Sequence, residues 1–116
     1  MKNTITAAAL LSAAIALPVG ASEEADDDSG LAYEDKLAAC AACHGENGDK
    51  PLAPDYPVLA GQYADYLAEA LKAYRSGRRQ HPIMNMQMEA LEINDGDIEK
   101  LSRHFASKKG LSTLGE

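Results

Sequence analysis

The stretch Cys40-Ala41-Ala42-Cys43-His44 decides how this 116-residue chain can fold and what it can bind. Cys-x-x-Cys-His is the attachment sequence of a c-type haem, in which two thiols form thioether bonds to the porphyrin and the histidine ligates the iron. On a helical turn, positions i, i+3 and i+4 share one face, so Cys40, Cys43 and His44 can all reach one porphyrin. The sequence therefore predicts one covalently attached haem c, carried by a helix.

Two other interpretations of the cysteine pair need features that the sequence does not offer. A thioredoxin-like redox pair is expected among alternating strands and helices, and no strand pattern is visible. A structural zinc site needs four ligands, but there is no further cysteine, and His81 and His104 lie far along the chain from the motif. Haem attachment is the interpretation that the motif favours.

The first 21 residues have the features of a secretory signal peptide. Lys2 precedes an uncharged stretch, 4–19, and the small residues Val19-Gly20-Ala21 offer a cleavage site before Ser22. The apolar run is shorter than the roughly 20 residues that a membrane-spanning helix requires. We therefore expect a periplasmic protein that is cleaved near Ala21 and has no stable membrane insertion.

Cleavage leaves 95 residues, enough for one small domain. Residues 22–29 are strongly acidic and are expected to form a disordered leader, which assigns 30–116 to the domain. With one phenylalanine and no tryptophan, a core of side chains alone would be marginal, so we expect the porphyrin to complete it. The net charge of −7 argues against nucleic acid or an anionic membrane as a partner.

Apolar spacing predicts three helices and no strands, an all-α fold. The first covers about 30–42 and ends in the haem motif, the second covers about 62–75, and the last begins near Asn94, a good N-cap, and runs toward Gly110. Between the first two, residues 46–61 contain three prolines and are expected to form a loop.

With these elements placed, the chain resembles the class I c-type cytochromes, in the bacterial periplasmic branch whose two-haem members carry two copies of this domain. The matching stretches are Cys40 to Gly45, Pro57-Val58-Leu59-Ala60-Gly61-Gln62, Tyr66-Leu67, Tyr74-Arg75-Ser76-Gly77-Arg78, Pro82-Ile83-Met84 and Asp97-Ile98. The resemblance implies a small fold of three main helices wrapped around one haem. It also implies shuttling of single electrons, with a histidine and a methionine as axial ligands.

The loop expected between the last two helices offers three methionines for the sixth position on the iron: Met84, Met86 and Met88. A thioether is a soft ligand that raises the potential, which suits an electron carrier. Counting forward from Gly77 against the family pattern selects Met84, whereas counting backward from Asp97 selects Met86. The disagreement implies a short insertion, which we place near Glu92-Ile93. We assign Met84, with Met86 as the alternative.

His81 lies three residues before Met84 and is a rival ligand, which would give bis-histidine coordination at a lower potential. For His44, the resemblance implies that the ring donates its second N–H to the carbonyl of Pro57. The haem propionates need donors, and four candidates lie on the second helix and the turn after it: Tyr63, Arg75, Arg78 and Arg79.

These features predict an electron carrier rather than an enzyme: a monomer that exchanges electrons with a donor reductase and with an acceptor oxidase or dehydrogenase. The alternative is the haem subunit of a periplasmic oxidoreductase, such as a sulfur-compound dehydrogenase. An open catalytic iron would lack the methionine ligand, whereas this sequence has a surplus of methionines. The sequence shows no second haem motif and no catalytic constellation.

Overall fold

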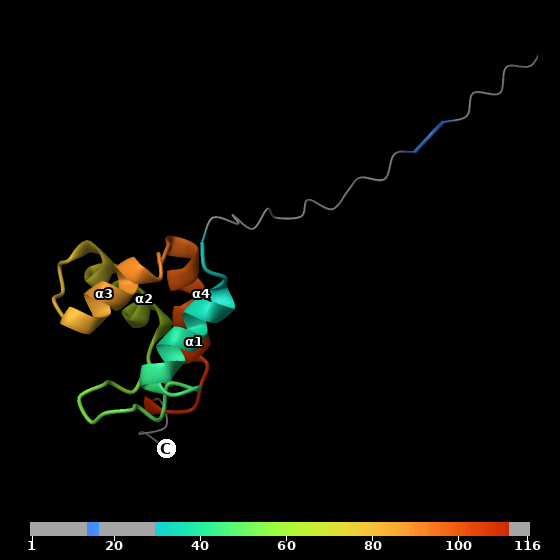
Figure 1. Ribbon diagram of the computed structural model, residues 1–116. Coiled ribbons are helices and arrows are strands. Elements are labelled where there is room, and N and C mark those ends of the chain that lie inside the picture. Colours follow the sequence, from blue (N-terminus) through green and yellow to red (C-terminus); the bar gives the residue numbers. More distant parts are fainter. Residues whose placement is uncertain (1–13, 17–29, 112–116) are drawn as a thin grey trace, which may run out of the picture.

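The structure, a computed structural model, describes residues 14–16 and 30–111. Within these residues it contains helices and no strands (Figure 1), which confirms the all-α class. The helices are α1 (Tyr33–His44), α2 (Ala64–Ser76), α3 (Pro82–Ala90) and α4 (Asp95–Ala106). Apart from 14–16, the expected signal peptide (1–21) and acidic leader (22–29) lie outside the described residues.

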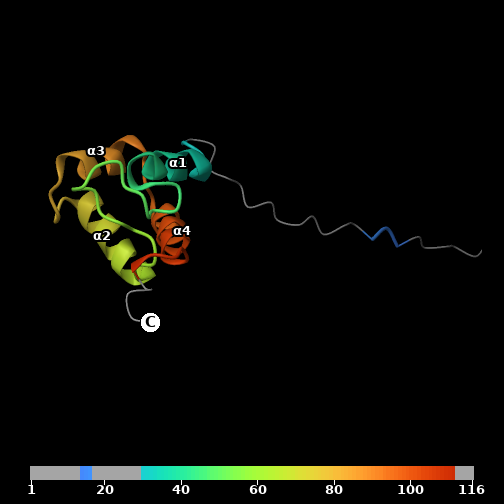
Figure 2. The same ribbon diagram turned by 90° about the horizontal axis from the view of Figure 1, so that it is seen from below.

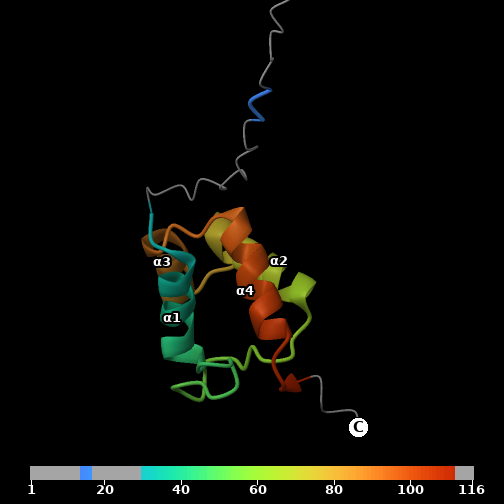
Figure 3. The ribbon, with the colours of Figure 1, turned by 90° about the vertical axis from the view of Figure 1, so that its right-hand side faces the viewer.

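Helix α4 contributes more buried core residues than any other helix. Ile98, Leu101 and Phe105 recur at helical spacing and are almost completely buried, and Leu67 of α2 and Met88 of α3 pack into the same cluster. Figure 3 shows α4 lying across α2, against which it packs. Burial of this apolar face stabilises α4 far more than its own helix propensity does.

The start of α4 confirms the cap expected at Asn94. The side chain of Asn94 accepts a hydrogen bond from the backbone N–H of Asp97 at 2.9 Å, and the carboxylate of Asp97 accepts one from the N–H of Asn94 at 3.0 Å. This reciprocal capping box satisfies two backbone donors that the helix itself cannot pair.

A buried ion pair links α1 to α4. Lys36 is only 4% exposed, and its Nζ lies 2.6 Å from Oδ2 of Asp97 and 3.2 Å from the carbonyl oxygen of Glu92. The carboxylate of Asp97 therefore both caps α4 and neutralises a lysine from the other end of the chain. The sequence analysis did not anticipate this pair.

The proline-rich segment between α1 and α2 is an irregular loop, as expected, and it is attached at both ends (Figure 2). The N–H of Leu52 donates to the carbonyl of Cys43 at 2.8 Å, and the N–H of Gly61 donates to the carbonyl of Phe105 at 3.0 Å. At Gly48, φ is +73° and a Cβ would lie 2.7 Å from the ring of Phe105, so the loop approaches α4 where only glycine fits.

Helix α1 agrees with the expected first helix: it carries the motif in its last turn, runs through to His44, and ends at Gly45, because no glycine or proline interrupts it earlier. One expectation about the helices was wrong. The segment expected to be a ligand loop is helix α3, so the structure has four helices where three were expected. Pro82 suits the first turn of α3, His81 caps it, and the residues that follow include good helix formers.

Replacing Asp97 by asparagine should destabilise the fold strongly. Asp97→Asn keeps an acceptor for the N–H of Asn94 but leaves the ammonium of Lys36 buried without a countercharge, so we expect the free energy of unfolding to fall by about 3–5 kcal/mol. Urea unfolding followed by far-ultraviolet circular dichroism measures this change.

The matched control is Glu99→Gln, which breaks the exposed pair between Glu99 and Arg103 on the same helix. This change should alter the free energy of unfolding by less than about 1 kcal/mol. Equal effects of the two substitutions would show that the pair between Lys36 and Asp97 has no special weight in the fold.

Candidate haem-binding site

The Cys-x-x-Cys-His motif occupies the last turn of α1. The side chains of Cys40 and Cys43 are partly buried and that of His44 is buried. Gly45 ends the helix directly after the motif, with φ at +92° and its N–H bonded to the carbonyl of Ala41. The motif is therefore presented by a regular helical turn, which puts both thiols and the imidazole on neighbouring positions of one face.

The imidazole of His44 is held by one defined hydrogen bond. Its Nδ1 lies 2.8 Å from the carbonyl oxygen of Pro57. A carbonyl can only accept, so Nδ1 carries the proton and Nε2 keeps the lone pair that a metal requires. Pro57 is the acceptor that the family resemblance implied.

Tyr56 belongs to the surroundings of His44, although the sequence analysis did not name it. The two ring centroids lie 6.3 Å apart and the ring planes are tilted by 46°. The only sequence signal for Tyr56 is its place beside Pro57. This tyrosine helps to enclose the face of α1 that carries the motif.

The chemistry of the thiols argues against a redox pair. Burial, with a smaller contribution from nearby Cys43, raises the pKa of Cys40 to about 11, although a backbone hydrogen bond opposes the shift. Reactive disulfide-exchanging cysteines have lowered pKa values, because they attack as thiolates. Cys40 therefore stays a neutral thiol at physiological pH.

Further metal ligands do not gather at the motif within the described residues. Across 14–16 and 30–111, no group of three or more His, Cys, Asp or Glu side chains is placed to hold a metal ion. The zinc interpretation of the cysteine pair gains no support from this part of the chain.

The three methionines occupy different environments on α3. Met88 is 3% exposed and belongs to the core, Met84 is partly buried against that core, and Met86 is 54% exposed. At 100° per residue, positions four apart fall on nearly the same face and positions two apart on opposite faces. Met84 and Met88 therefore share the inward side of α3, and Met86 lies on the outward side.

His81 and the proposed propionate donors each have their own surroundings in the fold. Nδ1 of His81 accepts a hydrogen bond from the N–H of Met84 at 3.4 Å and so caps α3. Arg78 is exposed, with its Nε 3.4 Å from the hydroxyl of Ser76. Tyr63 is 80% exposed at the start of α2. Within the described residues, none of these contacts joins one of these side chains to another, and their roles stay predictions.

Arg75 is engaged elsewhere in the described fold. Its Nη2 lies 2.6 Å from Oδ1 of Asp95, and its Nη1 donates to the carbonyl of Ile93 at 3.2 Å. The hydrogen bond and the charge of Arg75 lower the pKa of Asp95. The guanidinium thus ties the end of α2 to the start of α4, and its assignment to a propionate stays a prediction.

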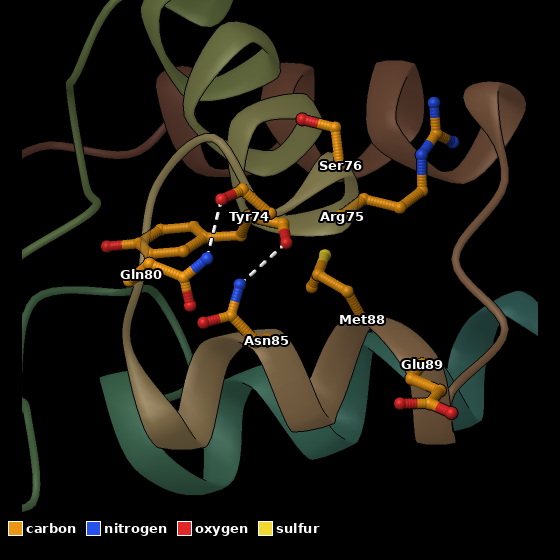
Figure 4. Close-up of a pocket in the computed structure, with 8 residues that line it drawn as sticks. Tyr74, Arg75, Ser76, Gln80, Asn85, Met88 and Glu89 are labelled. Atoms are coloured by element: carbon orange, nitrogen blue, oxygen red, sulfur yellow. Dashed lines mark hydrogen bonds between the residues drawn. The ribbon is translucent and has the colours of Figure 1, made fainter.

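Two cavities lie beside α2, away from the haem motif. One, of about 480 Å³, lies between the end of α2 and α3 (Figure 4), and its lining includes Gln80, Asn85 and Met88. The other, of about 400 Å³, lies between α2 and α4. Neither is lined by residues of the motif.

In the described part of the chain, no helix is long and apolar enough to cross a membrane.

The residues present fit a covalent haem. Two thiols share a helical face with a histidine whose tautomer leaves Nε2 available, and a partly buried thioether, Met84, lies on a second helix.

Comparison with known proteins agrees with this chemistry. The Cytochrome c family model matches residues 32–108.

Several bacterial proteins are similar in sequence. Cytochrome c-554(548) of Halomonas halodenitrificans is 42% identical over 79 residues, covering 67% of this chain and 94% of that protein. Cytochrome c4 of Pseudomonas aeruginosa is 36% identical over 74 residues, 64% of this chain and 35% of that protein. A protein named thiosulfate dehydrogenase electron acceptor, from Stutzerimonas stutzeri, is 35% identical over 77 residues, 66% of this chain and 35% of that protein.

The chain therefore spans nearly the whole of one relative and about a third of the other two. The family model covers most of the described domain, including the motif and all four helices. The chain belongs to the cytochrome c family, and it transfers electrons through one covalently attached haem c.

Proposed function

We propose that this protein is a periplasmic carrier of single electrons whose haem is ligated by His44 and Met84. The supporting observation is the combination of His44, with its Nδ1 fixed by Pro57, and a helix that turns Met84 inward. A bound haem supplies an iron that takes up and releases one electron. The chain supplies two thioether attachments, an oriented imidazole and a soft second ligand, which together leave no open position for a substrate.

Met84 is favoured over Met86 by burial as well as by the family pattern. A ligand has to leave solvent to reach a porphyrin iron, and Met86 is more than half exposed on the outward side of α3. Glu92 adopts a positive φ of 49° in the turn after α3, where we place the short insertion. An insertion of two residues in this turn would account for the different register counted from Asp97.

A second candidate function is the haem subunit of a periplasmic oxidoreductase. It is favoured by the similarity to a protein named thiosulfate dehydrogenase electron acceptor. Under either proposal the partners are redox proteins: a donor reductase and an acceptor oxidase or dehydrogenase. The two proposals differ in whether the protein works as a free monomer or within a complex.

The placement of Arg75, Arg78 and Tyr63 defines what each could do for a haem. Arg78 is exposed and makes only a long contact to Ser76, so its guanidinium is free to turn toward a propionate. Tyr63 is also exposed, so its hydroxyl is likewise free to turn toward a propionate. Arg75 would have to leave Asp95 first, which makes it the weakest of the three candidates.

Intact mass measurement of protein from a periplasmic extract tests export and attachment together. We expect a chain beginning at Ser22 that carries one haem. Cys40→Ala or Cys43→Ala should weaken attachment, and the double variant should yield haem-free protein with little near-ultraviolet circular dichroism, because so few large apolar side chains are available for a core. A native-like spectrum from the haem-free double variant would contradict this dependence on haem.

Met84→Ala should abolish the near-infrared sulfur-to-iron band of the ferric protein, lower the reduction potential and open the ferrous iron to carbon monoxide. Met86→Ala is the matched control, the same residue on the outward side of α3, and should leave all three properties intact. Met88→Ala should keep the band but lower the free energy of unfolding by about 2–5 kcal/mol, because it empties a core position. Loss of the band in Met86→Ala alone would move the ligand to that residue.

Electron transfer from this protein to its redox partner should slow as ionic strength rises. The protein is acidic overall, but four basic residues follow one another without an intervening acid at the end of α2 and in the turn after it: Lys72, Arg75, Arg78 and Arg79. Among the described residues, Lys72 pairs with Glu69 and Arg75 with Asp95, whereas Arg78 and Arg79 form no ion pair. Charged surfaces steer transient partners, and screening over about 8–10 Å removes that steering. Stopped-flow oxidation across a salt series measures the effect. A rate indifferent to salt would indicate apolar docking or a permanent complex.

A further inference from the structure

The side chain of Asn85 joins three backbone groups outside its own helical hydrogen bonds. Its Nδ2 donates to the carbonyl of Tyr74 at 2.7 Å and to the carbonyl of Arg79 at 3.0 Å. Its Oδ1 accepts from the N–H of His81 at 2.7 Å. Figure 4 shows Asn85 directed from α3 toward the last turn of α2. One residue thus connects α3, the loop before it and α2.

These partners specify a carboxamide. Two carbonyl oxygens require donors and one N–H requires an acceptor, so the orientation of the amide is unambiguous and no other side chain of this size satisfies all three. Asn85 lies in the first turn of α3, where accepting the N–H of the cap residue His81 also supports the start of the helix. The two hydrogen bonds from Nδ2 to the carbonyls of Tyr74 and Arg79 reach outside α3, so formation of the helix alone does not require them.

The groups that Asn85 joins are themselves well fixed. The N–H of Arg79 donates to the carbonyl of Ala73 at 3.1 Å, and the guanidinium of Arg79 lies 4.8 Å from the ring centroid of Tyr74. The loop between α2 and α3 is therefore attached to α2 before it reaches Asn85. A side chain bound to this loop is held against a rigid support.

Asn85 directly follows Met84 in the first turn of α3. The N–H of Met84 donates to Nδ1 of His81, and the N–H of His81 donates to Asn85. A movement of the backbone of this turn away from α2 therefore breaks contacts of Asn85. The position of Met84 is coupled to three hydrogen bonds of its neighbour.

We propose that Asn85 is a positioning residue for the axial ligand, which holds the first turn of α3 against α2 so that Met84 stays directed at the haem iron. The inference rests on the proposed ligation by Met84. Asn85 does not touch the iron in this proposal. It biases the equilibrium between ligated and released Met84 toward the ligated state.

The test compares release of the ligand with unfolding in the haem-loaded protein. In Asn85→Ala, the near-infrared band of the ferric protein should disappear on heating well below the temperature at which far-ultraviolet circular dichroism is lost, whereas in the unaltered protein the two transitions should lie closer together. Carbon monoxide should bind the ferrous variant at least about tenfold faster, since loss of these hydrogen bonds raises the released fraction by that order.

Asn85→Asp is a nearly isosteric second variant. It keeps an acceptor for the N–H of His81 but sets a carboxylate against two carbonyl oxygens, so it should release Met84 at least as readily as Asn85→Ala. Gln80→Ala is the matched control, because Gln80 is a carboxamide beside the same cavity that donates only to the carbonyl of Gly77, at 2.6 Å. It should leave the band and the carbon monoxide rate unchanged.

The inference is overturned if both Asn85 variants lose the band only together with the fold and bind carbon monoxide at the unaltered rate. If Asn85→Ala accumulates no haem-loaded protein, Asn85→Ser, which retains one hydroxyl donor, is measured in the same way and judged by the same outcomes. A band retained in Met84→Ala would refute ligation by Met84, and this inference with it. A band lost in Met84→Ala but unaffected in the Asn85 variants would refute this inference alone.

Discussion

The hydrogen bond between Nδ1 of His44 and the carbonyl oxygen of Pro57 is the contact on which the geometry of the site depends. It sets the tautomer of the imidazole and ties the last turn of α1 to the proline-rich loop. That loop is joined to α4 through the bond from Gly61 to Phe105 and through the close approach of Gly48 to the Phe105 ring. The metal-binding nitrogen is thus oriented by contacts that reach the centre of the core.

The two sides of the site are supported by different contacts. On the histidine side, α1 is anchored to α4 by the buried pair between Lys36 and Asp97. On the methionine side, α3 packs on α2, and its first turn is tied there by Asn85. Helix α4 connects the two sides, because it contacts α2 and shares the ion pair with α1. Rigid support on both sides suits a site that exchanges electrons, since little reorganisation should accompany the change of iron charge.

Membership of the cytochrome c family explains why so small a chain can be stable. Its largest core side chains come from α4, and the remaining cluster is completed by a few residues of α2, α3 and the segment between α3 and α4. A covalent haem adds apolar volume that a chain with one phenylalanine cannot supply from its own side chains. The chain matches 94% of the length of one relative, a cytochrome c-554(548).

The sequence by itself determined the features that depend on neighbours within about four residues. These are the haem motif on one helical face, the end of α1 at Gly45, the loop imposed by prolines and the cap of α4 at Asn94. Helix α3 stands where a loop was expected, because Pro82 and the cap at His81 start a helix in a stretch whose residues favour one. Only the tertiary structure decided which methionine points inward, that Arg75 binds Asp95, that Lys36 is buried on Asp97 and that Asn85 holds α3 to α2. The physical reason is that these contacts join groups far apart along the chain or depend on which face of a helix its neighbours cover, and neither property is encoded in local spacing.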